Sequence, residues 1–330
     1  MSAEQLLTDL DRQTIAVSKA LAADAVEKAG SGHPGTPISL AGVAWLLYQR
    51  EMVHDPADPG WLGRDRFVLS IGHASRVQYI QLSLAGYDID LEGFTAFRSP
   101  AGLPGHPEFG EVPGVETTTG PLGAGFANAV GLAMAARREH GLLDAGTPLS
   151  ESVFDHFVYT VLGDGCMQEG VSSEAASLAG TQQLGNLIAI YDDNDITIEG
   201  NTDLAFTEDV SARFAAYGWQ VIEVDWRAGD RYEEDLEALR ELVAANMIPG
   251  GDLERLDALL AEVDEDDSDD WNEWEPQLPD APAASGADSD EKDDEDEETE
   301  ETGRHRADLL AAARAVEGSA RTREGEAGIL

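Results

Sequence analysis

Two oxygen-bearing side chains follow two apolar segments of this sequence. Asp164, flanked by Gly163 and Gly165, comes directly after residues 156–162, and Asn194 follows residues 187–191. The interval between Asp164 and Asn194 is about one helix plus one strand, which places both residues at the same edge of a parallel sheet. A carboxylate and an amide oxygen, completed by a main-chain carbonyl, phosphate oxygens and water, suit Mg²⁺. The two glycines would let main-chain N–H groups approach the phosphate, although an isolated Gly-Asp-Gly is also typical of ordinary turns.

Three histidines form a second candidate group, because each follows a glycine: His33, His73 and His106. Glycine makes up 34 of the 330 residues, so fewer than one of the seven histidines should follow a glycine by chance. An imidazole beside a glycine stays open to a ligand, can hydrogen-bond sugar hydroxyls and can assist proton movement. The three are therefore candidates for ligand contact, although each one taken alone is also typical of a turn histidine. The other four are interpreted as surface or packing residues: His54, His140, His156 and His305.

These residues need a framework, and the apolar patterning before residue 246 supplies one. Helical and strand-like segments alternate, which predicts a parallel α/β sheet with helices on both faces. The predicted helices cover residues 6–29, 39–48, 79–85, 126–138, 172–183 and 232–245, and the predicted strands cover residues 67–70, 156–162, 187–191 and 218–224.

The charge of the chain is large and unevenly spread. The net charge is −44, from 21 Lys+Arg and 65 Asp+Glu, and residues 251–300 hold 23 acidic and two basic residues. Residues 247–302 are therefore predicted to be a disordered acidic segment, followed by a tail, 303–330, with a short helix at 307–320. Such acidity argues against binding to nucleic acid or to anionic membranes. A single cysteine, no signal-peptide pattern and no long apolar run favour a cytoplasmic location.

The motifs around these residues resemble one enzyme family. The fingerprint Gly163-Asp-Gly165 followed by Asp193-Asn-Asp-Ile196 resembles that of thiamine-diphosphate enzymes, and the run 162–175 is similar to transketolase. Further motifs stand in transketolase order from residue 6 to about residue 245: Gly32-His-Pro-Gly35, Gly72-His-Ala74, Thr119-Gly-Pro-Leu-Gly123 and Phe206-Thr-Glu-Asp-Val210. The resemblance implies a diphosphate-binding domain over residues 1–246.

The resemblance also assigns roles to individual positions. Asp164, Asn194 and the carbonyl of Ile196 would hold Mg²⁺, with Ca²⁺ or Mn²⁺ as substitute ions. Further contacts to thiamine diphosphate would come from the following positions: Gly163, Gly165 and His73 at the diphosphate, and Gly120, Pro121 and Leu122 beside the thiazolium ring. His33 and His106 would contact the ketose donor. Glu169 resembles a family residue at the dimer interface, and a surface helix cap is the alternative interpretation.

The implied activity is transfer of a two-carbon ketol unit between sugar phosphates in the pentose phosphate pathway. That chemistry needs a glutamate from a pyrimidine-binding domain, in a partner subunit or a homodimer-type assembly, and we expect no such domain in this sequence. The family pattern stops where residues 247–251 lead into acid-rich sequence. Three explanations stay open: a split-enzyme subunit, inactive alone; a truncated or frameshifted product; and a non-catalytic cofactor-binding or interaction module. The similar dihydroxyacetone synthase is not separated from transketolase by these motifs.

Overall fold

A computed structural model describes residues 7–197, 200–228, 231–232, 234–236 and 239–240. Its main sheet contains three parallel strands in the order β1-β2-β3: β1 (Arg66–Leu69), β2 (Val158–Gly163) and β3 (Leu187–Asp192). In the register of the sheet, Val68 lies opposite Thr160, which lies opposite Ala189. These strands are nearly continuous apolar runs because both faces of a parallel sheet are covered. The predicted fold class is confirmed.

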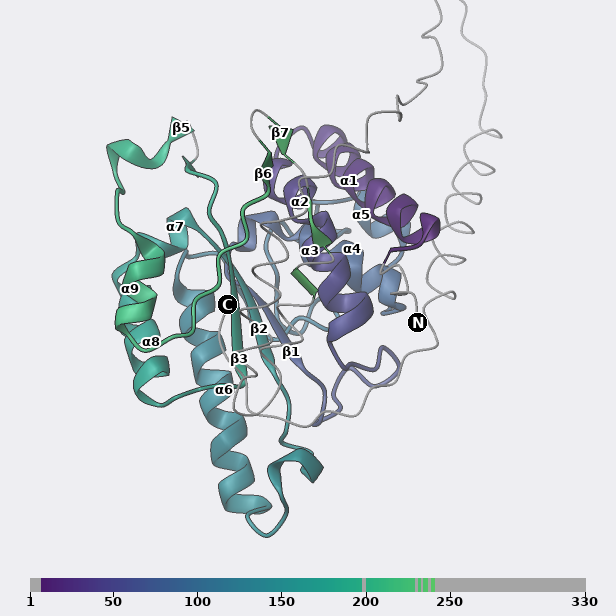
Figure 1. Cartoon of the computed structure of the whole chain (residues 1–330). Coiled ribbons are helices and arrows are strands. Elements are labelled where there is room, and N and C mark those ends of the chain that lie inside the picture. The colour runs from purple at the N-terminus through teal and green to yellow at the C-terminus, as the bar shows by residue number, and fades with distance from the viewer. Residues whose placement is uncertain (1–6, 198–199, 229–230, 233, 237–238, 241–330) are drawn as a thin grey trace, which may run out of the picture.

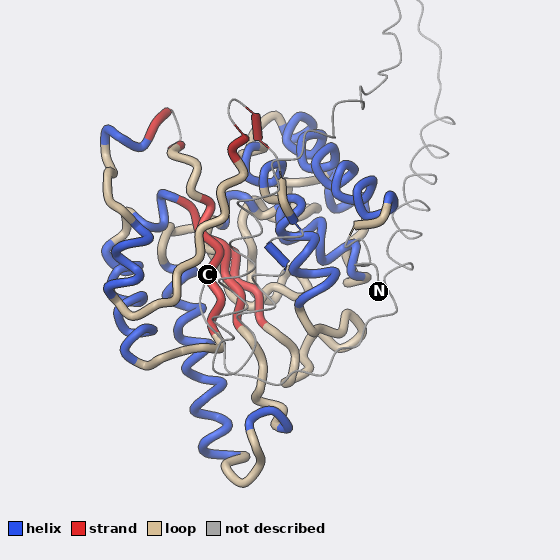
Figure 2. Tube along the Cα trace, viewed as in Figure 1, coloured by secondary structure: helices blue, strands red, loops and turns tan. Residues whose placement is uncertain are grey.

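Helices cover both faces of this sheet (Figures 1 and 2). On one face, α6 (Ala124–Leu143) packs against all three strands and against α8 (Gly170–Thr181). The N-terminal helices gather on the opposite side of the sheet in Figure 1. They are α1 (Asp9–Ala29), α2 (Gly35–Ser39), α3 (Ala41–Leu46), the π-helical turn η1 (Leu47–Glu51), α4 (Arg76–Ala85) and α5 (Leu91–Thr95).

Short elements connect and flank these layers. The remaining helical segments are η2 (Gly72–Ala74), η3 (Leu149–Glu151), α7 (Asp164–Met167), η4 (Thr202–Leu204) and α9 (Val210–Ala216). Two antiparallel pairs lie outside the main sheet: β4 (Ile196–Thr197) with β5 (Gly200–Asn201), and β6 (Arg227–Ala228) with β7 (Arg231–Tyr232). No helix in the described part of the chain combines the length and the apolar character needed to cross a membrane.

The first helix shows how local sequence sets an element's ends. The Thr8 hydroxyl accepts a hydrogen bond from the Asp11 amide, while the Asp11 carboxylate accepts one from the Thr8 amide, so α1 begins with a capping box. At the other end Gly30 adopts φ +64°, a left-handed conformation that glycine takes without steric cost. The helix predicted over residues 6–29 is therefore present with its first turn trimmed.

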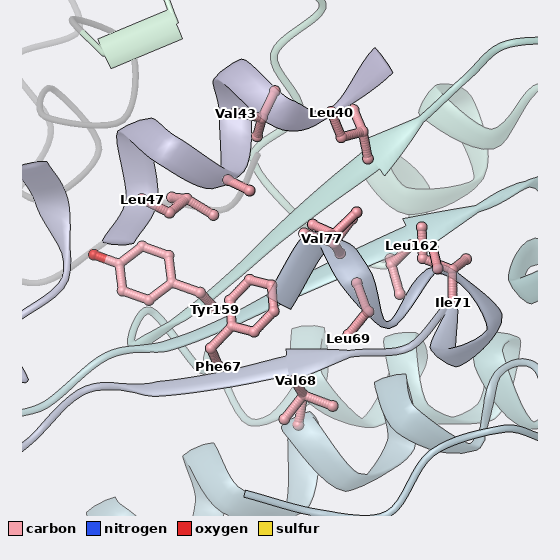
Figure 3. Packing of buried hydrophobic residues seen from close by; sticks show 14 of the residues in the cluster. Leu40, Val43, Leu47, Phe67, Val68, Leu69, Ile71, Val77, Tyr159 and Leu162 are labelled. Carbon is pink, nitrogen blue, oxygen red and sulfur yellow. The ribbon is translucent and has the colours of Figure 1, made fainter. Parts of the chain in front are cut away.

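The core lies between the sheet and the two helical layers. Figure 3 shows Leu40, Val43 and Leu47 above one face of the sheet, toward the rings of Phe67 and Tyr159. Val68 points to the opposite side of β1, as the alternation of side chains along a strand requires. All these side chains are buried.

A small residue in the first turn of α6 brings this helix close to the segment after β1. A Cβ atom added to Gly125 would lie 2.7 Å from the Ser70 Cα. The Ser70 hydroxyl accepts a hydrogen bond from the Phe126 amide and lies 3.3 Å from the Cys166 sulfur. The first turn of α6 is thus fixed against the segment that follows β1.

Two predictions about secondary structure need correction. Residues 218–224 are not a strand, because Trp219 instead donates its indole N–H to the Ala176 carbonyl of α8 and the segment makes no ladder within the described residues. Of the helix predicted over residues 232–245, Tyr232 belongs instead to β7, whereas Leu236, Leu239 and Arg240 are helical, and most of the other residues lie outside the described ones. Gly163 is the last residue of β2 and Asp164 begins helix α7, so the Gly-Asp-Gly sequence joins a strand to a helix and is not an ordinary turn.

The helix predicted at 39–48 is interrupted. It is divided among α2, α3 and η1, with Leu40 between the first two. The predicted acidic segment 247–302 and tail 303–330 lie outside the described residues.

Candidate cofactor and substrate site

The candidate site is built at the carboxyl edge of the main sheet. The register pairs Leu69 with Val161 and Gly163 with Asp192, so the segments after all three strands emerge on one side. Ligands of open parallel sheets bind at this edge. It receives η2 after β1, α7 after β2 and the loop that leads to β4 after β3.

Asp164 is the buried carboxylate of this edge, only 4% exposed. Its Oδ1 accepts a hydrogen bond of 2.5 Å from the Tyr191 hydroxyl, whereas its Oδ2 is buried without a partner in the described residues. Burial raises the Asp164 pKa, the Tyr191 hydrogen bond opposes that shift, and the charges of Asp193 and Asp195 raise it further. A buried oxygen with no donor is costly, and a bound cation would remove the cost.

The loop after β3 places the other predicted ligands. The Asn194 side-chain oxygen accepts a hydrogen bond of 3.0 Å from the Ile196 amide, and its NH₂ group donates to Asp192 at 2.9 Å. Asp195 is left-handed, with φ +57°. The Asn194 main-chain amide acts on the Asp164 carboxylate and lowers its pKa, which places this loop beside α7. The Ile196 side chain is an exposed hydrocarbon without a donor atom, so the predicted role falls to its main-chain carbonyl.

The donor set is compatible with a hard divalent cation that is coordinated by both protein and phosphate oxygens. No cluster of three or more His, Cys, Asp or Glu side chains suited to a metal exists among the described residues. One carboxylate, one amide oxygen and one carbonyl leave several coordination positions of the cation for non-protein oxygens. Mg²⁺ that binds a nucleotide or a diphosphate is coordinated in this way. The unpartnered Asp164 oxygen fits this arrangement.

The three predicted histidines come together at the same edge. The imidazole centroids of His33 and His73 are 4.7 Å apart, and both rings are influenced by the charge of His106. Burial, followed by His33 and His106, lowers the His73 pKa to about 4. Burial and the guanidinium groups of Arg98 and Arg76 lower the His33 pKa. At neutral pH, His73 and His33 are therefore neutral and able to donate through one nitrogen and accept through the other.

The segment 119–123 links the histidines to Asp164. A Cβ atom on Gly120 would lie 3.6 Å from the His106 ring, and one on Gly72 would lie 2.7 Å from the Thr119 hydroxyl. At its other end, Leu122 lies against Gly165, where an added Cβ would be 2.7 Å from the leucine side chain. Glycines at 72 and 165 therefore permit the close approach of this segment to the strand ends.

Glu169 stands apart from the buried part of the site. It occupies the N-cap position of α8, but its exposed side chain makes no capping hydrogen bond. The alternative of a surface cap, considered from the sequence, is therefore not supported for the carboxylate. The side chain is available for other contacts.

The structure adds three residues that the sequence patterns do not single out. Tyr191 holds Asp164, Arg76 donates from its Nη2 to the His33 carbonyl at 2.8 Å, and Arg98 lies beside Gly32 and Gly105. Tyr191 sits one residue before the end of β3 and reads as a core aromatic in sequence. Arg76 reads as a surface residue because arginine is seldom fully buried.

The fold and the position of the candidate residues together define a class: parallel α/β domains that bind their ligands at the carboxyl ends of their strands. Residues 10–249 match the family model described as transketolase, thiamine diphosphate binding domain. The chain belongs to this family.

Individual relatives agree with the family match. The chain is 54% identical over 219 residues to the transketolase of Mycobacterium tuberculosis, which covers 66% of this chain and 31% of that protein. It is 49% identical over 238 residues to transketolase 1 of Saccharomyces cerevisiae, covering 72% and 34%. A solved Pichia stipitis transketolase in complex with sedoheptulose 7-phosphate aligns with a TM-score of 0.62 and 49% identity, covering 66% of this chain and 32% of that one. This chain thus spans about a third of the length of these relatives.

Proposed function

We propose that this chain binds thiamine diphosphate together with Mg²⁺ and supplies the diphosphate-binding part of a transketolase. The observation that carries the proposal is the buried, unpartnered oxygen of Asp164 at the strand edge of a domain in the thiamine diphosphate binding family. Residues 1–246 would form the domain, and the activity would be ketol transfer between sugar phosphates in the pentose phosphate pathway.

The proposed cation site consists of Asp164, Asn194 and the carbonyl of Ile196. Asp164 would bind through Oδ2, because Oδ1 is engaged by Tyr191. Asn194 would use its side-chain oxygen, which has a second lone pair beside the one directed at the Ile196 amide. Oxygen donors of this kind suit Mg²⁺, and Ca²⁺ or Mn²⁺ are the proposed substitutes.

The remaining predicted residues would line the cofactor and the sugar. Gly163, Gly165 and His73 would lie at the diphosphate, and Gly120, Pro121 and Leu122 would lie along the ring that carries the chemistry. His33 and His106 would face the sugar phosphate. The neutral state of His33 at physiological pH lets it both donate to and accept from sugar hydroxyls. When bound, thiamine diphosphate supplies the nucleophile and the electron sink, and the protein positions the reactants.

We also propose that the pyrimidine-binding part of the active site comes from elsewhere, either a second chain or a further region of a longer protein. The chain spans about a third of its relatives, which is consistent with one functional portion of a larger active site. The exposed Glu169 carboxylate at the start of α8 is the residue we propose for contact with a partner subunit. A cytoplasmic location is proposed from the single cysteine.

Isothermal titration calorimetry with thiamine diphosphate tests the binding part of this proposal. The expected result is saturable binding in the presence of Mg²⁺ and its loss when EDTA replaces the metal. Binding that is equally strong with EDTA would contradict the proposed cation bridge. An absence of binding at millimolar cofactor would contradict the function of the isolated chain as a cofactor-binding domain.

A further inference from the structure

Arg76 is a buried cation without an ion-pair partner in the described part of the chain. The residue is 0% exposed, and its Nε and Nη1 atoms have no hydrogen-bond partner within the residues that the structure describes. Isolated buried charges are unfavourable and are normally paired. This cation is also close to a like charge, because burial and then Arg98 lower the Arg76 pKa to about 10. The group remains protonated at neutral pH.

The contacts that Arg76 does make converge on the loop that carries His33. Its Nη2 donates to the His33 carbonyl at 2.8 Å, and its guanidinium lies 4.4 Å from the centre of the Phe97 ring. Charge-assisted hydrogen bonds and stacking on an aromatic ring both hold a planar guanidinium in a fixed orientation. Arg76 therefore connects the first turn of α4 to the loop between α1 and α2.

Gly32 shows how tightly this loop is enclosed. Its φ is +141°, and an added Cβ would lie 3.3 Å from Val26, 3.4 Å from Arg76 Nη1 and 3.6 Å from Arg98 Nη1. The loop is thus bounded by α1 on one side and by two guanidinium groups on another. The His33 residue is exposed as a whole, but its imidazole is partly enclosed, with its ring centroid 4.7 Å from that of His73.

We propose that Arg76 is a positioning residue for His33: it fixes the main chain of the Gly32–His33 loop and so holds the His33 imidazole beside His73. The inference rests on the proposed function only in assigning His33 to the sugar phosphate. The position of the His33 ring beside His73 is a property of this chain alone and is measurable without turnover. Arg76 acts through His33 and has no proposed contact with the substrate or the cofactor.

The same arrangement affects the pKa of the His33 imidazole. The groups that act on the His33 imidazole are Arg98, Arg76 and His106, together with the neighbouring ring of His73. Burial is the first cause of the lowered His33 pKa, followed by the two guanidinium groups. Removing the charge of Arg76 should therefore move the His33 pKa upward, while Arg98 and burial continue to act.

The experiment is NMR of the full chain, with the histidine rings assigned through single His→Gln variants. In Arg76→Met we expect the nuclear Overhauser contact between the rings of His33 and His73 to be lost and the His33 pKa to rise. Arg50→Met is the matched control, because Arg50 is also stacked on an aromatic ring, Trp45, but pairs with Asp11. The control should leave the ring contact and the His33 pKa unchanged.

Two results would overturn the proposal: an intact ring contact with an unchanged His33 pKa in Arg76→Met, or equal changes in Arg50→Met. If Arg76→Met does not fold, Arg76→Lys decides, because lysine keeps the charge without the planar group. A weakened ring contact with a His33 pKa near that of the unaltered chain supports positioning, and an unchanged contact contradicts it. In an active assembly, Arg76→Met should lower kcat/KM for the sugar phosphate about tenfold, since a displaced contact residue is costly. Thiamine diphosphate affinity should stay within about twofold, which separates a failure of this inference from a failure of cofactor binding.

Discussion

At the scale of single residues, the two oxygens of the Asp164 carboxylate have different surroundings. One accepts a hydrogen bond from Tyr191, and the other has no hydrogen-bond partner among the described residues. An oriented carboxylate with a free, buried oxygen is suited to bind a cation, because its direction is fixed before the ion arrives. The same residue without the ion carries the cost of a buried, unsatisfied acceptor.

Asp164→Asn should separate these two effects. The substitution removes the charge, so Mg²⁺-dependent binding of thiamine diphosphate should fall by at least about 100-fold. The free energy of unfolding of the ligand-free chain should change little or increase, since a neutral amide is less costly to bury than a carboxylate. Calorimetry and urea denaturation measure the two quantities, and unchanged cofactor affinity would show that Asp164 is not a metal ligand.

Tyr191→Phe tests whether the orientation of Asp164 matters. Loss of the hydroxyl frees Asp164 Oδ1, and we expect Mg²⁺ affinity in the presence of thiamine diphosphate to fall about tenfold, as is usual when a second hydrogen-bond layer is removed. Tyr217→Phe is the control, because that residue lies away from the strand edge in the turn after α9. Equal effects of the two substitutions would contradict a role for Tyr191 at the cation site.

His156 provides a prediction about pH. Burial lowers its pKa to about 4, so the unfolded chain binds a proton below about pH 6.5 while the folded chain does not until about pH 4. The contribution of His156 to stability is therefore complete above pH 6.5 and is lost as the pH falls toward 4. When the pH is lowered from 7 to 5, the free energy of unfolding should fall by about 1 to 2 kcal/mol less in His156→Gln than in the unaltered chain. Urea denaturation at the two pH values is the measurement. An identical pH dependence in both proteins would contradict the buried, neutral state.

At the scale of elements, the site depends on how closely α6 and the segment 119–123 approach the strand ends. Gly125 and Gly131 lie in the same helix but in different surroundings. An added Cβ at Gly125 would lie 2.7 Å from the Ser70 Cα, whereas one at Gly131 would meet nothing within 4 Å. Gly125 therefore faces the segment after β1, whereas Gly131 lies on the exposed side of α6.

The pair Gly125→Ala and Gly131→Ala tests this packing. The first should lower the free energy of unfolding by about 1 to 3 kcal/mol, because the added methyl overlaps the backbone after β1. The second should raise it by about 0.5 to 1 kcal/mol, because alanine favours a helix and the position is open. Chemical denaturation of both variants is the measurement. A higher free energy of unfolding in Gly125→Ala, a lower one in Gly131→Ala, or the same value in both variants would contradict this packing of α6.

Some strands could be predicted from the sequence, and one predicted strand is absent. The three strands of the main sheet follow from apolar runs, and their parallel pairing follows from the helix between β2 and β3. The segment 218–224 has the same apolar character, but tertiary contact decided its structure: the Trp219 indole bonds to α8, and no ladder forms in the described residues. Local pattern cannot distinguish a strand from an extended segment held by a side chain.

Part of the candidate site could also be predicted from the sequence. Spacing alone brings Asp164 and Asn194 to one edge, and the three Gly-His pairs indicate a group that the structure does bring together. The supporting residues could not be predicted, because Tyr191 and Arg76 act through contacts that cross from one element to another. Their partners are far away in sequence, so no local pattern marks them.

At the scale of the whole molecule, the net charge of −44 says little about the ligand. The site is proposed to receive anionic phosphates in an acidic protein, and the positive character needed there is local. Arg76 and Arg98 lie beside His33, and the proposed cation would add two charges at Asp164. The strongly acidic residues 251–300 lie outside the described structure.

The proposal that a pyrimidine-binding part comes from elsewhere has a consequence for activity. The purified chain should show no ketol transfer from xylulose 5-phosphate to ribose 5-phosphate in a coupled assay, even with thiamine diphosphate and Mg²⁺. Addition of a protein that supplies the pyrimidine-binding domain should restore turnover if the two form one active site. Turnover by the pure chain would contradict the need for a partner.

Asp164, Asn194 and the Ile196 carbonyl are proposed to bind a divalent cation that also contacts thiamine diphosphate. The most direct measurement is a crystal structure of the chain grown with Mn²⁺ and thiamine diphosphate, in which anomalous scattering locates the metal. We predict one anomalous peak within about 2.5 Å of the Asp164 carboxylate, with oxygens of the diphosphate completing its coordination. A bound diphosphate whose metal lies elsewhere, or a peak without contact to Asp164, would contradict the account.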